Sequence, residues 1–239
     1  MKKKILALAL IVCLAIIAVA GATLAYFSDT DTKTNIFTSG KVDITLNEVF
    51  DAESAQLIPG VDIQKDVTIS LSKDSIDTYV WYTYAIPAAL DNDDASMNII
   101  HVNHAGRNWL AYRENQKYWA EGQTEATPAD QCWIVDHEVK KNVEIDGVLY
   151  NVYTVLYNGV LKAGETTTIG MTKVYCDTKV DFDNEKGVYT IHGQPIGFDL
   201  NNVKIIVTAY GIQAATFESV EEAYAAYNTQ AAEVPVDID

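Results

Sequence analysis

Four histidines are the residues of this 239-residue chain best suited to metal chemistry. No His-Glu-x-x-His pattern is present among them. His101 and His104 are three positions apart, near a stretch (residues 98–102) that is typical of a strand. There they would point to opposite faces unless the strand ends between them. A zinc enzyme needs three protein ligands and an open position, so His101 and His104 are candidate ligands without a complete set. The four are His101, His104, His137 and His192.

Two acidic clusters could supply oxygen ligands for calcium. They are residues 91–94 and residues 181–185, and the second offers Asp181 and Asp183. Neither has the glycine that the EF-hand spacing requires. Asx side chains also favour turns, which explains both clusters without a metal. We therefore expect no cofactor, with calcium as the alternative.

Nucleophilic catalysis has no recognisable pattern here. The chain shows no Ser-His-Asp order, nucleophile elbow or phosphate-binding loop. These observations favour a protein that is not an enzyme.

The N-terminus has the pattern of a secretory signal peptide. Three lysines at positions 2–4 precede an uncharged apolar run over residues 5–20, and Thr23-Leu24-Ala25 supplies small residues for a signal peptidase. We expect residues 1–25 to be removed by cleavage between Ala25 and Tyr26. An uncleaved anchor is the alternative, because residues 5–27 are nearly long enough to span a bilayer.

Charge and cysteine content fit an exported protein. Lys plus Arg number 17 and Asp plus Glu 33, and the resulting charge of −16 repels nucleic acid and anionic lipid. We therefore expect no nucleic-acid partner, and membrane contact only through the signal segment. Cys132 and Cys176 remain after cleavage. In an oxidising compartment they could form a disulfide, and two buried thiols are the alternative.

Alternating apolar and polar residues predict an antiparallel β-sandwich over residues 26–232. Residues 78–86 are dense in aromatic and β-branched side chains, as a strand buried on both faces would be. Asp146-Gly147 and Asn158-Gly159 are typical of tight hairpins. Ser219 with Glu222 forms a capping box for one short C-terminal helix. Residues 233–239 read as a loose acidic tail.

The middle of the chain, residues 91–141, is the least regular part. We expect strands combined with an irregular insertion. Its aromatic side chains and those just before it could form a surface that binds carbohydrate or protein, although core packing explains most such residues. They are Tyr79, Trp81, Tyr82, Trp109, Tyr112, Tyr118 and Trp119.

Three blocks of sequence form a recognisable set. The first runs from Thr23-Leu24-Ala25-Tyr26-Phe27-Ser28-Asp29 to the stretch Asn35-Ile36-Phe37-Thr38-Ser39-Gly40-Lys41-Val42-Asp43-Ile44. The second is Leu57-Ile58-Pro59-Gly60 with residues 65–69, and the third is residues 206–214 with the helix that follows. Together they resemble the TasA/camelysin family of bacterial surface and biofilm-matrix proteins. The resemblance covers both ends of the chain and is weaker in the middle.

The resemblance implies a jelly-roll-like β-sandwich, cleavage by the signal peptidase dedicated to this family, and a place in the extracellular matrix or on the cell surface. It also implies self-assembly into fibres, with residues 26–37 adding a strand to the next subunit. Tyr26, Phe27, Ile36 and Phe37 would fill pockets there. The alternatives are that the segment folds back onto its own sheet, or that the protein is a metal-dependent peptidase of camelysin type.

Overall fold

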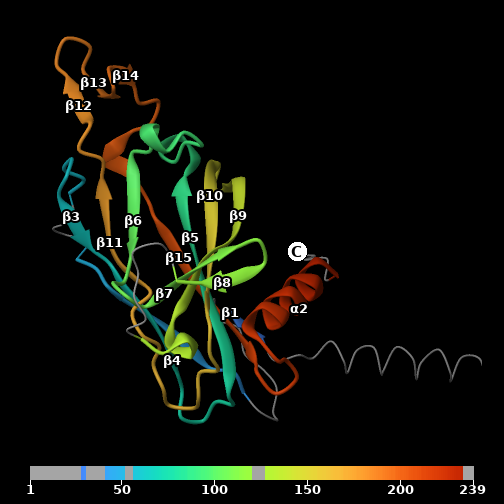
Figure 1. Cartoon of the computed structure of the whole chain (residues 1–239). Coiled ribbons are helices and arrows are strands. Elements are labelled where there is room, and N and C mark those ends of the chain that lie inside the picture. The colour runs from blue at the N-terminus through green and yellow to red at the C-terminus, as the bar shows by residue number, and fades with distance from the viewer. Residues whose placement is uncertain (1–27, 31–40, 52–55, 120–126, 234–239) are drawn as a thin grey trace, which may run out of the picture.

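The computed structural model describes residues 28–30, 41–51, 56–119 and 127–233. The predicted signal peptide and its cleavage site at Ala25 and Tyr26 lie outside these residues, as do positions 234–239 of the predicted tail. The described residues form an all-β sandwich with a C-terminal helix, as the alternation predicted (Figure 1). Four short 3-10 helices connect strands: η1 (Ala88–Leu90), η2 (Ala95–Met97), η3 (Ala129–Gln131) and η4 (Leu200–Asn202).

The first layer is a seven-stranded sheet built around a central strand, β5. Its order is β1-β15-β5-β10-β9-β7-β8. The strands are β1 (Ser28–Thr30), β15 (Ile206–Gln213), β5 (Thr78–Pro87), β10 (Val148–Tyr157), β9 (Trp133–Ile145), β7 (Trp109–Arg113) and β8 (Gln116–Tyr118). Nine of the ten residues of β5 are buried, which confirms the prediction of a strand covered on both faces.

The second layer combines two small sheets. β2 (Ile44–Val49) pairs with β4 (Asp66–Leu71), and β11 (Met171–Cys176) lies between β3 (Asp62–Gln64) and β6 (Ile100–His104). The amides of Thr167 and Gly170 donate to the carbonyls of Ile69 and Val67, so the segment leading into β11 continues the pairing of β4. The two small sheets therefore act as one layer.

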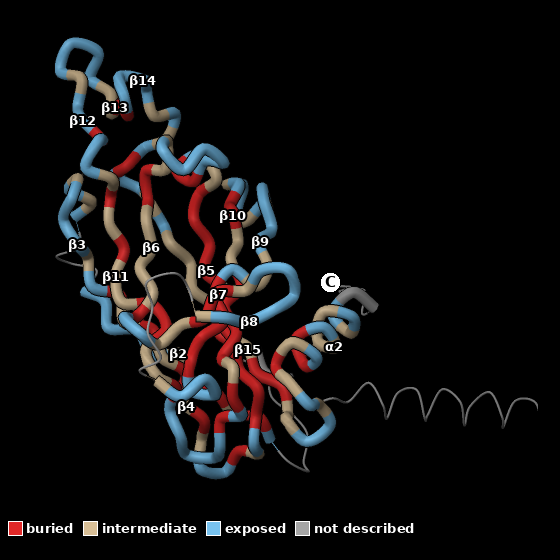
Figure 2. Tube along the Cα trace, viewed as in Figure 1, coloured by how far each residue is buried: buried red, intermediate tan, exposed pale blue. Residues whose placement is uncertain are grey.

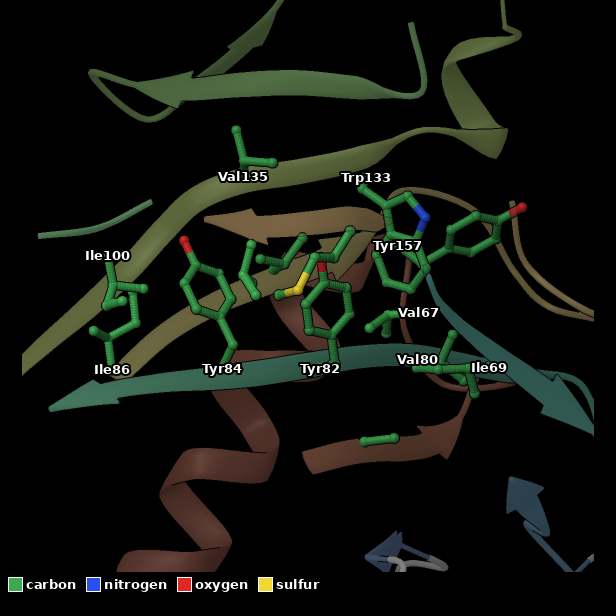
Figure 3. Packing of buried hydrophobic residues seen from close by; sticks show 14 of the residues in the cluster. Val67, Ile69, Val80, Tyr82, Tyr84, Ile86, Ile100, Trp133, Val135 and Tyr157 are labelled. Carbon is green, nitrogen blue, oxygen red and sulfur yellow. The ribbon is translucent and has the colours of Figure 1, made fainter. Parts of the chain in front are cut away.

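The main core lies between the two layers. Val80, Tyr82 and Tyr84 of β5 face Val67 and Ile69 of β4 within one buried cluster (Figure 3). The trace of buried residues runs through both layers, whereas the third small sheet projects from one end and has exposed turns (Figure 2). That sheet contains β12 (Val180–Asp183), β13 (Val188–Ile191) and β14 (Gln194–Pro195).

A second, smaller core lies on the outer face of the large sheet, under helix α2 (Val220–Glu233). Val220 and Ala223 are fully buried there against Trp81 of β5. The Ser219 hydroxyl accepts a hydrogen bond from the amide of Glu222 at 3.2 Å, as the capping box predicted. The Glu222 carboxylate accepts from the amide of Glu218.

Of the two hairpin turns predicted from the sequence, the structure contains one. Asp146 and Gly147 have φ values of 50° and 77° and join β9 to β10, which confirms the first hairpin. Asn158-Gly159 does not close a hairpin, because the chain runs on to Leu161, which bridges Thr78 of β5. Glycine is needed there for space: a Cβ on Gly159 would lie 2.1 Å from the carbonyl oxygen of Asp130.

One pairing departs from the predicted antiparallel arrangement. β7 runs parallel to β9, with Trp109 opposite Trp133. A parallel pair needs a long crossover connection, and β8 with residues 119–132 supplies it. The irregular middle of the chain is therefore the connection that places β7 beside β9.

Candidate strand-docking site

The large sheet has a partly open edge at β15. One side of β15 pairs with β5 over its whole length, from Ile206 opposite Ala85 to Gln213 opposite Thr78. On its other side β1 pairs antiparallel with residues 210–212 only. Within the described part of the chain, residues 206–209 therefore have a strand on one side alone. An edge of this kind can accept a further strand through its main-chain groups.

An apolar groove of about 490 Å³ adjoins the open half of β15. It lies where the start of β15 meets β3, β11 and the end of β2, so it opens between the two layers. Its lining is mainly apolar and includes two lysines. The lining residues are Phe50, Leu57, Ile63, Lys65, Val174, Val203, Lys204, Ile205 and Ile206.

Exposed apolar side chains continue the groove across the end of the second layer. A neighbouring hollow of about 460 Å³ shares Phe50 and Ile63 with it. Val49, Ile58 and Val61 line this hollow and are 58%, 48% and 47% exposed. Contiguous apolar surface of this kind is typical of binding sites.

An ion pair between buried Lys65 and the more exposed Glu48 adjoins the groove. The Lys65 side chain is only 5% exposed, and its Nζ lies 2.9 Å from Oε1 of Glu48. The same Nζ lies 4.7 Å from the centre of the Phe50 ring. The ammonium group thus neutralises Glu48 and holds the ring at the mouth of the groove.

The predicted docking segment is only partly within the described residues. Tyr26, Phe27, Ile36 and Phe37 lie outside them. The backbone of Ser28–Thr30 lies on β15 of the same chain, which is the folded-back arrangement that the sequence left as an alternative.

The predicted metal ligands are not brought together. His101 and His104 both lie on β6. The His101 Nε2 lies 2.8 Å from Oδ2 of Asp177 and its ring stacks on Tyr175. Burial would raise the pKa of Asp177, but hydrogen bonds from the Lys179 amide and from His101 outweigh it and lower that pKa.

His104 is half-buried. Its ring lies 6.1 Å from the rings of Tyr84 and Trp109. Burial lowers the pKa of His104 to about 4, so the imidazole is neutral at physiological pH. The third histidine, His137, lies under α2 between the rings of Tyr112 and Tyr224.

The acidic clusters serve turns. Oδ1 of Asp183 accepts from the amides of Glu185 and Lys186, and Oδ1 of Asp181 accepts from the amide of Phe182. In the first cluster, Asp91 is buried and accepts from the Asn151 side chain. Across the described residues, no three His, Cys, Asp or Glu side chains form a group that could hold a metal ion.

The predicted Cys132–Cys176 disulfide is absent. Both thiols are buried, and no bond joins them. Gly170 abuts the ring of Trp133, the residue next to Cys132. Cys176 lies six residues further along the strand, about 20 Å at 3.3 Å per residue. The two sulfurs are therefore far beyond bonding distance, which the sequence could not reveal.

The aromatic side chains of the middle region are mostly structural. Tyr79, Trp81 and Tyr82 are buried. Trp109, Tyr112 and Trp119 are half-buried, and Tyr118 is exposed. They do not form the continuous surface that a carbohydrate-binding face would need.

The described residues define an all-β sandwich whose large sheet has a partly open edge at β15. Residues 1–100 match the model of a family described as camelysin metallo-endopeptidase. This match confirms the predicted resemblance to the TasA/camelysin family over the first 100 residues. Neither a curated protein nor a solved structure matches the chain. Within the described residues, no helix is long and apolar enough to cross a membrane.

Proposed function

We propose that this protein is a secreted structural component of the cell surface or extracellular matrix, which self-associates by β-strand addition. The observation that carries the proposal is the division of the β15 edge. Residues 210–212 already accept β1 as a strand, whereas the edge at residues 206–209, unpaired within the described chain, begins at Ile206, which lines an apolar groove. The first strand of one molecule could leave its own edge and extend along the whole edge of another.

The free energies favour a β1 strand that can leave its own sheet and dock on another molecule over one that stays permanently attached. β1 pairs through only three residues, Ser28, Asp29 and Thr30. Ordering an extended segment costs about 1–2 kcal/mol for each residue. Burying one large apolar side chain returns about 1.5–3 kcal/mol. A strand that also fills the groove with apolar side chains therefore gains more binding free energy than β1 gains by pairing with residues 210–212 of β15 alone.

Truncation tests this function. The mature chain starting at Tyr26 is compared with a version starting at Thr38, by light scattering and electron microscopy over a range of concentrations. We expect concentration-dependent assembly of the mature chain alone. Equal behaviour of the two proteins would refute strand addition by this segment.

A secreted metal-dependent peptidase is the second candidate, because the matched family is described by that activity. All four histidines lie beyond the matched residues 1–100, so the match carries no histidine ligand. We expect purified mature protein to lack tightly held zinc and caseinolytic activity. One equivalent of zinc, with casein cleavage abolished by a chelator and by His101→Ala or His104→Ala, would establish the peptidase.

A further inference from the structure

Three residues distant in the sequence meet on the outer face of the large sheet. Lys117 lies on β8, Asn158 follows the end of β10, and Glu221 lies in the first turn of α2. The Lys117 Nζ is 2.7 Å from Oδ1 of Asn158 and 3.0 Å from Oε1 of Glu221. An amine, a carboxamide and a carboxylate are therefore in direct contact.

The carboxamide is held in one orientation. Its Nδ2 donates a hydrogen bond of 2.7 Å to the backbone carbonyl of Ala129. A carbonyl can only accept, so the nitrogen must face Ala129 and the oxygen must face Lys117. The amine thus contacts the carbonyl whose carbon it could attack, and the amide nitrogen lies on the far side.

The carboxylate is placed to carry a proton. One oxygen of Glu221 contacts the lysine, and the other is buried without a hydrogen-bond partner. A carboxylate with a buried, unpaired oxygen is costly to keep charged, and a proton taken from the lysine by the other oxygen would remove that charge. The side chains of Glu221 and Lys117 are 21% and 34% exposed, so the site is partly screened from water. Ammonia could still leave through the opening beside Lys117.

We propose that Lys117 and Asn158 form an intramolecular isopeptide bond, with Glu221 as the proton carrier. Glu221 takes a proton from the lysine ammonium, and the neutral Nζ attacks Cγ of Asn158. A C–N bond forms to Nζ, and the bond from Cγ to Nδ2 breaks. Glu221 passes this proton to Nδ2, which leaves as ammonia, and the carboxylate then takes the second proton that Nζ loses as the amide forms. No oxidant or further reactant is needed, and fixed contact between the reacting groups supplies the rate advantage of an intramolecular reaction.

The bond would fasten the last strand of the sheet. β8 is at the end opposite to β1, and in the described residues its sheet neighbour is β7 alone. An amide between positions 117 and 158 would close a loop that contains the whole of β9. A covalent link at this place would resist peeling of β7 and β8 from the sheet, in a protein whose two buried cysteines form no disulfide.

Intact-mass spectrometry of the mature protein tests the proposal. We expect a mass lower than that of the sequence by one ammonia, and a branched peptide joining the segments around Lys117 and Asn158 after proteolysis. The Lys117→Met and Glu221→Gln variants should have the full mass; Glu221→Gln retains nearly the same size and shape, so it serves as the folded control. An unmodified mass of the parent protein would overturn the proposal.

A competing reaction must be distinguished. Asn158 precedes Gly159, and cyclisation of this pair to a succinimide also releases ammonia. That product would persist in the Lys117→Met variant and would give no branched peptide. A mass deficit of this kind would refute the isopeptide bond. A deficit that persists in Glu221→Gln together with the branched peptide would refute the role given to Glu221.

Discussion

Replacing Gly170 by alanine tests how tightly the two layers pack. Gly170 precedes β11 and faces the central strand of the opposite layer. A Cβ there would lie 2.8 Å from Cε1 of Tyr82 and 3.0 Å from Cε2 of Trp133. Both rings are fully buried, so neither can move without displacing its own neighbours. The backbone of Gly170 is not in the left-handed region, and the cost is therefore one of space alone.

Overpacking of a well-filled core costs about 1–3 kcal/mol. For a domain of this size, each kcal/mol lowers the melting temperature by about 2–4 °C. We expect Gly170→Ala to lower it by about 2–12 °C in thermal unfolding followed by circular dichroism. Gly197→Ala is the matched control, because nothing lies within 4 Å of its Cβ position and its φ is not positive. Equal melting temperatures for the two variants would refute the close contact of the layers.

Three further predictions concern stability. Gly159→Ala should cost more than Gly170→Ala in urea unfolding, because its Cβ would meet a backbone carbonyl at 2.1 Å rather than a side chain; a smaller loss would contradict the position of Asp130. Ser219→Ala should cost about 0.5–2 kcal/mol through loss of the helix cap, with Ser219→Asp retaining stability, and equal losses in both would exclude capping. The pKa of His104 is about 4, below its ordinary 6.5, so the unfolded chain binds the proton first and stability falls as pH decreases from 6.5 to 4. The slope from this residue reaches at most about 1.4 kcal/mol per pH unit. It should be missing from His104→Phe and should therefore appear in the difference between the parent protein and that variant; parallel pH profiles would contradict the assignment.

Local sequence patterns predicted individual strands and the helix, but contacts between distant segments determine the strand order and the candidate site. Residues 78–86 and the Ser219–Glu222 cap are signalled by adjacent residues, and both were confirmed. The parallel pairing of β7 with β9 was not predictable, because alternation does not record strand direction. The prediction of a Cys132–Cys176 bond was wrong for a related reason, because spacing in the sequence does not fix the distance between two residues in the fold.

The groove was missed because its residues come from four separate segments. Phe50, Leu57, Val174 and Ile205 are ordinary apolar residues in their local sequence. The exposed Ile58 belongs to a block that also carries the family resemblance, and this was the one available signal. Contacts among Lys117, Asn158 and Glu221 gave no sequence signal, since each is an unremarkable polar residue of a strand, bend or helix.

Strand addition from one molecule to the sheet of another is tested most directly by a cross-link between chains. Thr30 lies opposite Tyr210 in the antiparallel pair of β1 and β15. Directly opposite residues have Cβ atoms about 4.5–5.5 Å apart, close enough for cysteines placed there to be oxidised to a disulfide after a small adjustment. Mature Thr30→Cys protein is mixed with mature Tyr210→Cys protein and oxidised; the parent protein, whose own cysteines are buried, is the control.

Strand addition predicts a disulfide-linked dimer that contains one chain of each variant, identified on a non-reducing gel and by mass spectrometry. The double variant Thr30→Cys/Tyr210→Cys reports on attachment within one chain. Intramolecular bonding in the double variant, with no mixed dimer even at concentrations where light scattering would detect assembly, would show that β1 stays on its own sheet and would contradict the account.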